Sequence, residues 1–170
     1  MTDNISFEHE DSLACRLLSV FSKKGLTFAA AESCTGGLIL SRLTAIPGSS
    51  SVVEGGVVSY SNEVKERVLS VKGETLRDFG AVSEETAREM AEGVRRITGA
   101  DVAVSVTGIA GPGGGTEKKP VGTVCFGVCT EAEAATEIKH FGEDLSRDEI
   151  RRLASDHALS LALSKAGKEN

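Results

Sequence analysis

A strand-like run that passes through a short glycine-rich turn into a helical pattern is the feature that most constrains this fold. Residues 26–31 are small and apolar, which is typical of a short buried strand. The turn over 32–37 has the sequence ESCTGG, and apolar residues then recur at helical spacing over 38–43. A strand joined so directly to a helix predicts an α/β fold in which side chains of the turn project beyond the sheet.

Helical and strand-like patterns alternate over most of the 170 residues. Helical spacing predicts helices over 13–21, 36–44, 62–69, 74–79, 83–98 and 146–164. Apolar runs predict strands over 27–31, 51–60, 101–106, 121–129 and 135–141, the last two as an antiparallel pair. The alternation predicts a three-layer α/β/α sandwich with a mixed, partly parallel sheet. Because no linker or repeat interrupts it, we expect one domain over 1–170, with flexible ends at 1–10 and 166–170.

Composition limits the class of protein and its partners. The net charge of −6 and the lack of any long Lys/Arg cluster argue against nucleic-acid binding. No apolar run approaches the roughly 18 residues that span a bilayer. The acidic, polar residues 1–11 do not read as a signal peptide, so we expect a cytoplasmic protein that does not bind membranes. Four cysteines without a C-x-x-C pair are expected to be reduced thiols, with no metal site: Cys15, Cys34, Cys125 and Cys129.

Ser33 is the candidate nucleophile because its hydroxyl lies on the turn at the end of a predicted strand. Backbone N–H groups of the following turn and first helical residues are free to bind an anion in an isolated helix. A nucleophile beside such an anion site is half of an acyl-transfer active site. Cys34 is the rival nucleophile, but it points elsewhere on the turn and has no histidine partner in the sequence nearby.

A serine nucleophile also needs a base, and no histidine lies near the loops that should follow the parallel strands. Lys65 is the better candidate, since burial and the positive end of a helix would both lower its pKa. Tyr60 is placed to hydrogen-bond that amine. The same spacing also fits a surface lysine on an amphipathic helix, with Tyr60 packed at a strand end.

The glycine-rich segment 108–115 follows the predicted strand 101–106 and matches neither a Walker A loop nor the G-x-G-x-x-G pattern. Two interpretations stay open, a backbone nest or flap over a site and a long mobile loop. Thr107, just before it, would direct its hydroxyl into the same crevice as Ser33. Arg147 opens the last helix and has the chemistry of a phosphate clamp, although most arginines on helices are only solvated.

Four motifs in one order resemble the CinA C-terminal domain family of nicotinamide-nucleotide amidases. They are AESCTGG at 31–37, GxVxYSNxxK at 56–65, GAVS at 80–83 and TGIAGPxGG with KPVGTV at 107–124. The resemblance covers about residues 10–165. It implies hydrolysis of the carboxamide of nicotinamide mononucleotide to nicotinate mononucleotide and ammonia, without metal or cofactor.

The resemblance also implies roles for individual residues. Ser33 matches the nucleophile, Lys65 the base, Tyr60 the residue that assists the lysine, and Thr107 a polar residue of the catalytic pocket. The oxyanion of the reaction would then form near the N–H groups of Gly36 and Gly37. The segment that ends in Arg147 is longer than the family's usual Gly-Asp-Arg. The positions expected to bind substrate are Thr35, Gly36, Gly37, Asn62, Gly108, Gly111 and Arg147.

Other functions remain compatible with these motifs. The family name comes from bacterial competence and DNA damage, so a non-catalytic interaction or regulatory protein with the same fold is the main alternative. A hydrolase acting on another small amide is a third. Larger family members carry an N-terminal pyrophosphatase domain, whose activity is not expected here. The expected partner is a small-molecule nucleotide substrate, and small apolar surfaces would also allow a homo-oligomer.

Overall fold

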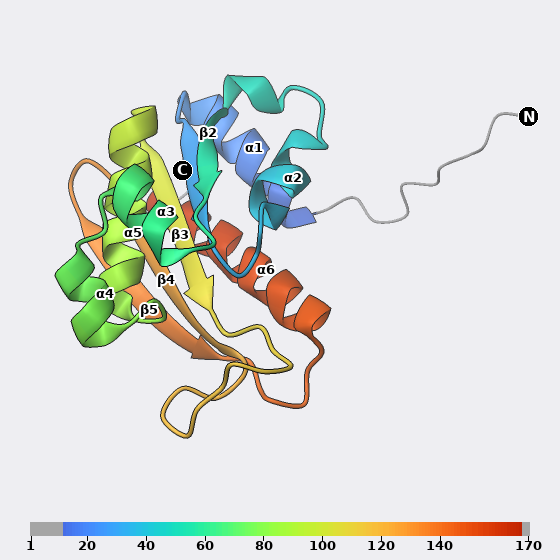
Figure 1. Cartoon of the computed structure of the whole chain (residues 1–170). Helices are drawn as coiled ribbons and strands as arrows, with labels where there is room; N and C mark the ends of the chain where they lie inside the picture. Colours follow the sequence, from blue (N-terminus) through green and yellow to red (C-terminus); the bar gives the residue numbers. More distant parts are fainter. Residues whose placement is uncertain (1–11, 168–170) are drawn as a thin grey trace, which may run out of the picture.

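One five-stranded sheet with helices on both faces forms the structure, a computed structural model that describes residues 12–167 (Figure 1). The strand order is β2-β1-β3-β4-β5. Strands β2, β1 and β3 run parallel, whereas β4 pairs antiparallel with both β3 and β5. The predicted α/β/α sandwich with a mixed sheet is confirmed. The strands are β1 (Phe28–Glu32), β2 (Val53–Val58), β3 (Val102–Gly108), β4 (Thr123–Cys129) and β5 (Ala134–His140).

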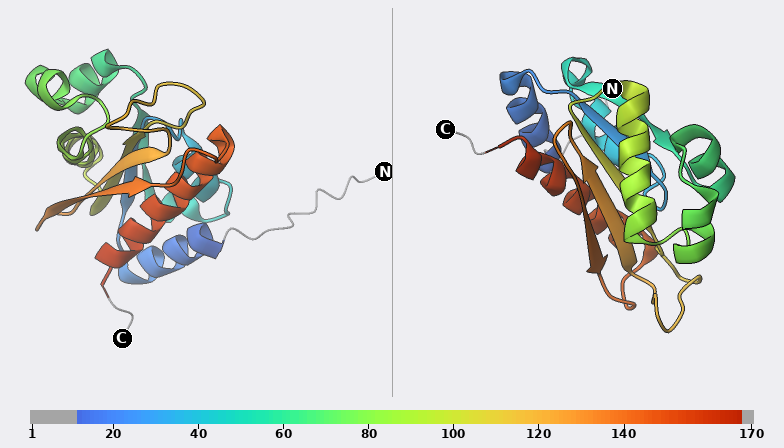
Figure 2. Two further views of the ribbon diagram at one scale, coloured as in Figure 1. Left: turned by 90° about the horizontal axis from the view of Figure 1, so that it is seen from below. Right: turned by 90° about the vertical axis from the view of Figure 1, so that its left-hand side faces the viewer.

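Three helices cover each face of the sheet (Figure 2). One layer consists of α1 (Ser12–Lys24), α2 (Leu38–Thr44) and α6 (Arg147–Lys165). The other consists of α3 (Asn62–Leu69), α4 (Gly73–Phe79) and α5 (Glu84–Thr98). The helix starts follow from capping residues, because the hydroxyls of Ser83 and Ser146 accept hydrogen bonds from the N–H groups three residues on. All six predicted helices are present, with ends within a few residues of the expected ones.

Small residues bring α5 close to the sheet and so fix one wall of the site. A Cβ on Gly127 of β4 would lie 2.4 Å from the carbonyl oxygen of Ala87, so only glycine permits this approach. Ala29 and Ala31 of β1 and Met90 of α5 are fully buried in the same apolar layer. The N-terminus of α5 and the segment before it are thereby held beside the carboxyl end of β3.

The structure differs from two expectations about where segments end, at β3 and at the C-terminal tail. Strand β3 extends past the predicted 101–106 to Gly108, because Thr107 and Gly108 pair with Cys125 and Val124 of β4. Ala166, expected in a flexible tail, is buried, and its carbonyl accepts a hydrogen bond from Lys24 Nζ at 2.8 Å. The expected flexible ends at 1–10 and 168–170 lie outside the described residues. Within 12–167, each helix is too short or too polar to cross a bilayer.

Candidate active site

The carboxyl ends of the parallel strands β1, β2 and β3 meet at one edge of the sheet, and a pocket of about 200 Å³ opens there. This is the edge at which α/β proteins assemble their sites, because the loops that follow parallel strands converge there. All three loops singled out from the sequence contribute to it. The residues that line the pocket are Ser33, Cys34, Tyr60, Lys65, Ala81, Val82, Thr107, Gly108, Ala110 and Arg147.

Ser33 and Lys65 lie in direct contact in this pocket. Lys65 Nζ is 3.0 Å from Ser33 Oγ, and it also donates a hydrogen bond to the carbonyl oxygen of Ser59 at 2.6 Å. The lysine comes from the first half of α3 and is only 1% exposed, so the surface interpretation of this residue is wrong. The predicted proximity of nucleophile and base is present in the structure.

Burial changes the acid–base properties of the candidate base, Lys65, and of the rival nucleophile, Cys34. Loss of hydration disfavours the ammonium form and lowers the pKa of Lys65 from 10.5 to about 8, against a smaller opposite effect of Cys34. Burial raises the pKa of the Cys34 thiol to about 12, so this thiol stays protonated at neutral pH. Ser33 beside a partly neutral amine is therefore the nucleophile that the chemistry favours.

A buried carboxylate next to the nucleophile occupies the N-terminus of α2. Glu32 is fully buried at the end of β1, and its carboxylate accepts hydrogen bonds from three backbone N–H groups. The donors are Gly37 at 3.0 Å, Ile39 at 3.2 Å and Leu40 at 3.0 Å. Charge-assisted bonds and the helix dipole compensate the buried charge. Glu32 was not among the residues predicted for the site, although an acidic residue that ends an apolar strand is a visible signal.

The anion site expected at Gly36 and Gly37 is therefore wrong. The N–H of Gly37 is bonded to Glu32, and the N–H of Gly36 donates to the carbonyl oxygen of Ser33 at 3.1 Å. Their role is conformational, since φ is +61° at Gly36 and +97° at Gly37, where a residue with a side chain is strained. At the start of an isolated helix these N–H groups would be free, but here the Glu32 carboxylate and the carbonyl oxygen of Ser33 accept their hydrogen bonds.

Other predicted substrate positions also lie outside the residues that line the pocket. Thr35 is fully buried, and its hydroxyl has no hydrogen-bond partner among the described residues. Its carbonyl oxygen accepts a bond from Arg151 at 3.0 Å. Asn62 is exposed at the start of α3, and Gly111 is buried. None of these three residues lines the pocket.

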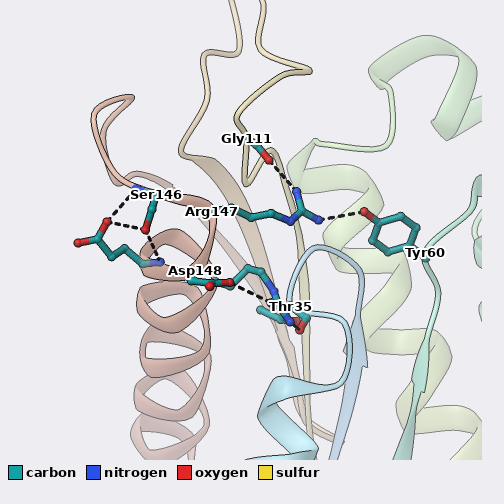
Figure 3. A network of polar contacts seen from close by, with 8 residues as sticks. Thr35, Tyr60, Gly111, Ser146, Arg147 and Asp148 are labelled. Atoms are coloured by element: carbon teal, nitrogen blue, oxygen red, sulfur yellow. Dashed lines mark hydrogen bonds and ion pairs between the residues drawn. The ribbon is translucent and has the colours of Figure 1, made fainter.

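Arg147 and Tyr60 meet at the pocket mouth (Figure 3). Arg147 donates from Nη1 to the carbonyl oxygen of Gly111 at 2.7 Å and from Nη2 to the hydroxyl of Tyr60 at 3.1 Å. The expected hydrogen bond from Tyr60 to Lys65 is wrong, because Tyr60 is 64% exposed and Ser59 holds the amine instead. No carboxylate among the described residues pairs with Arg147, so its charge is free to attract an anion.

A family model for the CinA C-terminal domain matches residues 10–166. The chain belongs to the CinA C-terminal domain family. It is 61% identical over 114 residues to a CinA-like protein of Chloroherpeton thalassium, covering 67% of this chain and 27% of that protein. It is 49% identical over 149 residues to a putative competence-damage inducible protein of Clostridium perfringens, covering 88% and 36%. The chain thus spans well under half the length of these curated relatives.

Solved structures of CinA proteins share the fold over almost the whole domain. The competence/damage inducible protein CihA from Agrobacterium tumefaciens has a TM-score of 0.88 and 44% identity, covering 90% of this chain and 93% of that one. The competence damage-inducible protein A from Klebsiella pneumoniae has a TM-score of 0.87 and 33% identity, covering 93% and 98%.

The glycine-rich loop of this CinA domain is tied to the opposite pocket wall. Lys119 Nζ donates to the carbonyl oxygens of Phe79 at 2.8 Å and Val82 at 2.7 Å, on the connection between α4 and α5. Thr107, in the pocket as predicted, donates its hydroxyl to Ala81 on the same connection at 2.7 Å. With Arg147 bonded to Gly111, the loop is held at two points, which sequence analysis did not predict. Among residues 12–167, no three His, Cys, Asp or Glu side chains form a group that could hold a metal ion.

Proposed function

We propose that this CinA domain hydrolyses the carboxamide of nicotinamide mononucleotide, giving nicotinate mononucleotide and ammonia. The observation that carries the proposal is the 3.0 Å contact between Lys65 Nζ and Ser33 Oγ inside a pocket that lowers the pKa of the amine. A nucleophile, a base with a suitable pKa and a cavity beside them are what amide hydrolysis through an acyl-enzyme requires. The four sequence motifs supply the choice of substrate.

The chemistry proceeds through an ester on Ser33. Neutral Lys65 takes the hydroxyl proton as Ser33 Oγ bonds to the carboxamide carbon, and the carbonyl π electrons move onto oxygen. When the carbonyl re-forms, the C–N bond breaks and the Lys65 ammonium gives its proton to the departing ammonia. Water then attacks the ester with Lys65 as base, releasing the carboxylate product and Ser33.

Size and charge support a nucleotide amide as the substrate. The pocket, at about 200 Å³, is smaller than typical ligand sites, and it suits a single aromatic ring with its carboxamide. The rest of the substrate would then extend through the mouth, where Arg147 has no acidic partner among the described residues. A guanidinium in this position favours a phosphate.

The decisive test measures ammonia released from nicotinamide mononucleotide by the wild type and by Ser33→Ala and Lys65→Ala. We expect each variant to lose about 10³-fold or more of kcat, since both residues act as one unit. Ser22→Ala and Lys23→Ala, which change exposed residues of α1, are the matched controls and should retain activity. Full activity of Ser33→Ala would exclude the proposed mechanism.

The names of the relatives favour a second candidate, a role in competence or the response to DNA damage without catalysis. The intact Ser33–Lys65 contact is not needed for such a role. Folded wild-type protein that releases no ammonia from nicotinamide mononucleotide would shift the assignment to this candidate.

A further inference from the structure

The oxyanion formed by attack of Ser33 needs hydrogen-bond donors, and the N-terminus of α2 cannot supply them. Glu32 already holds the N–H of Gly37, and the N–H of Gly36 is bonded to the carbonyl of Ser33. A second anion there would also be repelled by the buried carboxylate. The N–H groups of Gly36 and Gly37 are therefore not available to the oxyanion.

We infer that the backbone N–H groups of Gly108 and Ala110, at the end of β3, form the oxyanion hole. This inference rests on the proposed function, because it requires Ser33 to attack a carbonyl. Both residues line the pocket together with Ser33 and Lys65. Two backbone donors aimed at one developing charge are the usual form of such a hole.

The pairing of β3 with β4 determines where these two N–H groups point. Ile109 N–H donates to the carbonyl of Thr123 at 2.9 Å, and Ile109 O accepts from Gly122 N–H at 2.8 Å. In an antiparallel ladder, residues that bond to the partner strand alternate with residues that face away from it. Gly108 therefore directs its N–H group away from β4, and Ala110, which follows Ile109 beyond the ladder, lines the pocket.

On the side of β3 that faces β1, strand β1 ends before it can offer an acceptor to the N–H group of Gly108. Ser33 N–H donates to Val106 O at 2.9 Å, and in the parallel register the next bond would run from Gly108 N–H to Ser33 O. The turn after β1 instead bends Ser33 O toward Gly36 N–H, at 3.1 Å. The Gly108 N–H is left without an acceptor next to the nucleophile.

Burial makes the unpaired donors significant. Ala110 is 4% exposed, and its backbone N–H has no hydrogen-bond acceptor among residues 12–167, while the pairing of β3 with β1 ends before Gly108. Buried N–H groups are nearly always paired, so the unpaired N–H of Ala110, beside the half-buried Gly108 in one pocket, indicates a ligand oxygen. Position 108 also has no room for a side chain, because a Cβ there would lie 2.8 Å from Val124 Cγ2 and 2.9 Å from Thr123 O.

The test replaces single N–H groups by oxygen, using genetically encoded α-hydroxy acids to place a backbone ester at position 108 or 110. We expect each ester to lower kcat for ammonia release by about 10²–10³-fold with little change in KM, as for loss of one oxyanion donor. An ester at position 109, which removes the bond to Thr123, is the matched control. It should lower thermal stability but leave kcat within about 3-fold of the wild type, well short of the loss of about 10²–10³-fold expected for the esters at 108 and 110.

A boronic acid separates this inference from the choice of substrate. Pyridine-3-boronic acid forms a tetrahedral adduct with a serine hydroxyl, and its affinity can be measured without any hydrolysis. We expect the esters at 108 and 110 to weaken its Ser33-dependent binding at least about 10-fold, because the adduct has the shape and charge of the tetrahedral intermediate.

The outcomes are distinct. Weakened adducts in a protein that does not hydrolyse nicotinamide mononucleotide would support the oxyanion hole and exclude the proposed substrate. Ser33-dependent hydrolysis with unchanged kcat and unchanged boronate affinity in both esters would overturn the oxyanion hole alone. A wild type with neither activity nor a Ser33 adduct would overturn both.

Discussion

At the scale of single residues, burial without a counter-ion determines the chemistry of the site. Lys65 is enclosed by the pocket, and among the described residues it is bonded only to neutral oxygens, those of Ser33 and Ser59. Its ammonium form therefore loses hydration without gaining an opposite charge, and the pKa falls to about 8. Cys34, next to it, is buried as well, and there burial raises the pKa to about 12. Burial therefore makes the ammonium of Lys65 easier to deprotonate and the thiol of Cys34 harder to deprotonate.

A pH profile tests the role of Lys65. Only the neutral amine accepts the proton of Ser33, and the neutral fraction rises as the pH rises through about 8. We expect kcat/KM for ammonia release to increase tenfold per pH unit below about 7 and to level off above about 9.

Cys34→Ala is the control for this profile. Removing the thiol takes away only the smaller effect that opposes the lowering of the Lys65 pKa, so the profile should keep its shape and its midpoint should fall slightly. A profile that is flat from pH 6 to pH 10 in both proteins would argue against Lys65 as the base.

At the scale of secondary-structure elements, the short helix α2 depends on Glu32. Its seven residues are too few for a stable helix without tertiary support. Three backbone N–H groups at its N-terminal end donate hydrogen bonds to the buried carboxylate of Glu32. The same contacts fix the turn that carries Ser33, so helix stability and nucleophile position have a common origin.

Glu32→Gln tests this dependence. The amide group has one acceptor oxygen in place of two and directs an NH₂ group at backbone donors. We expect the free energy of unfolding in urea to fall by about 2 kcal/mol or more. Glu54→Gln, on the exposed side of β2, is the matched control and should change it by less than about 0.5 kcal/mol. Equal stability of the two variants would show that α2 does not need the carboxylate.

At the scale of the whole molecule, the pocket is assembled from both layers and the sheet. Ser33 follows β1, Lys65 lies on α3, and Arg147 begins α6 on the opposite face. The loop between β3 and β4 spans these parts, bonded to Arg147 through Gly111 and to the α4–α5 connection through Lys119. Closure of the pocket therefore depends on contacts between segments far apart in the chain.

Lys119→Met tests whether the loop contact closes the pocket. Loss of both hydrogen bonds frees the loop from the α4–α5 connection, so a non-specific protease should cleave within 112–119 several-fold faster. The KM for the nucleotide should also rise several-fold. Lys118→Met changes the neighbouring exposed lysine and should alter neither measurement. Unchanged cleavage in Lys119→Met would show that other contacts hold the loop.

The sequence by itself determined the local structure and the chemical parts. Periodicity predicted the six α-helices and the five strands, and the strand–turn–helix unit placed Ser33 at the edge of the sheet. Motif and residue type together selected Lys65, Thr107 and Arg147, all of which line the pocket. These features depend on near neighbours in the chain, which is why pattern and propensity could predict them.

Only the tertiary structure decided which donor meets which acceptor. Glu32 accepts the hydrogen bond of the Gly37 N–H expected to bind the oxyanion, and Arg147 bonds the hydroxyl of Tyr60 that was expected at Lys65. The pairing of β1 with β3 ends at Glu32 and Val106, so Gly108 lies beyond the last paired residue of that register. Hydrogen bonds are satisfied through space, across strands and layers, so the pairing of each polar group depends on the register and packing of segments far apart in the sequence.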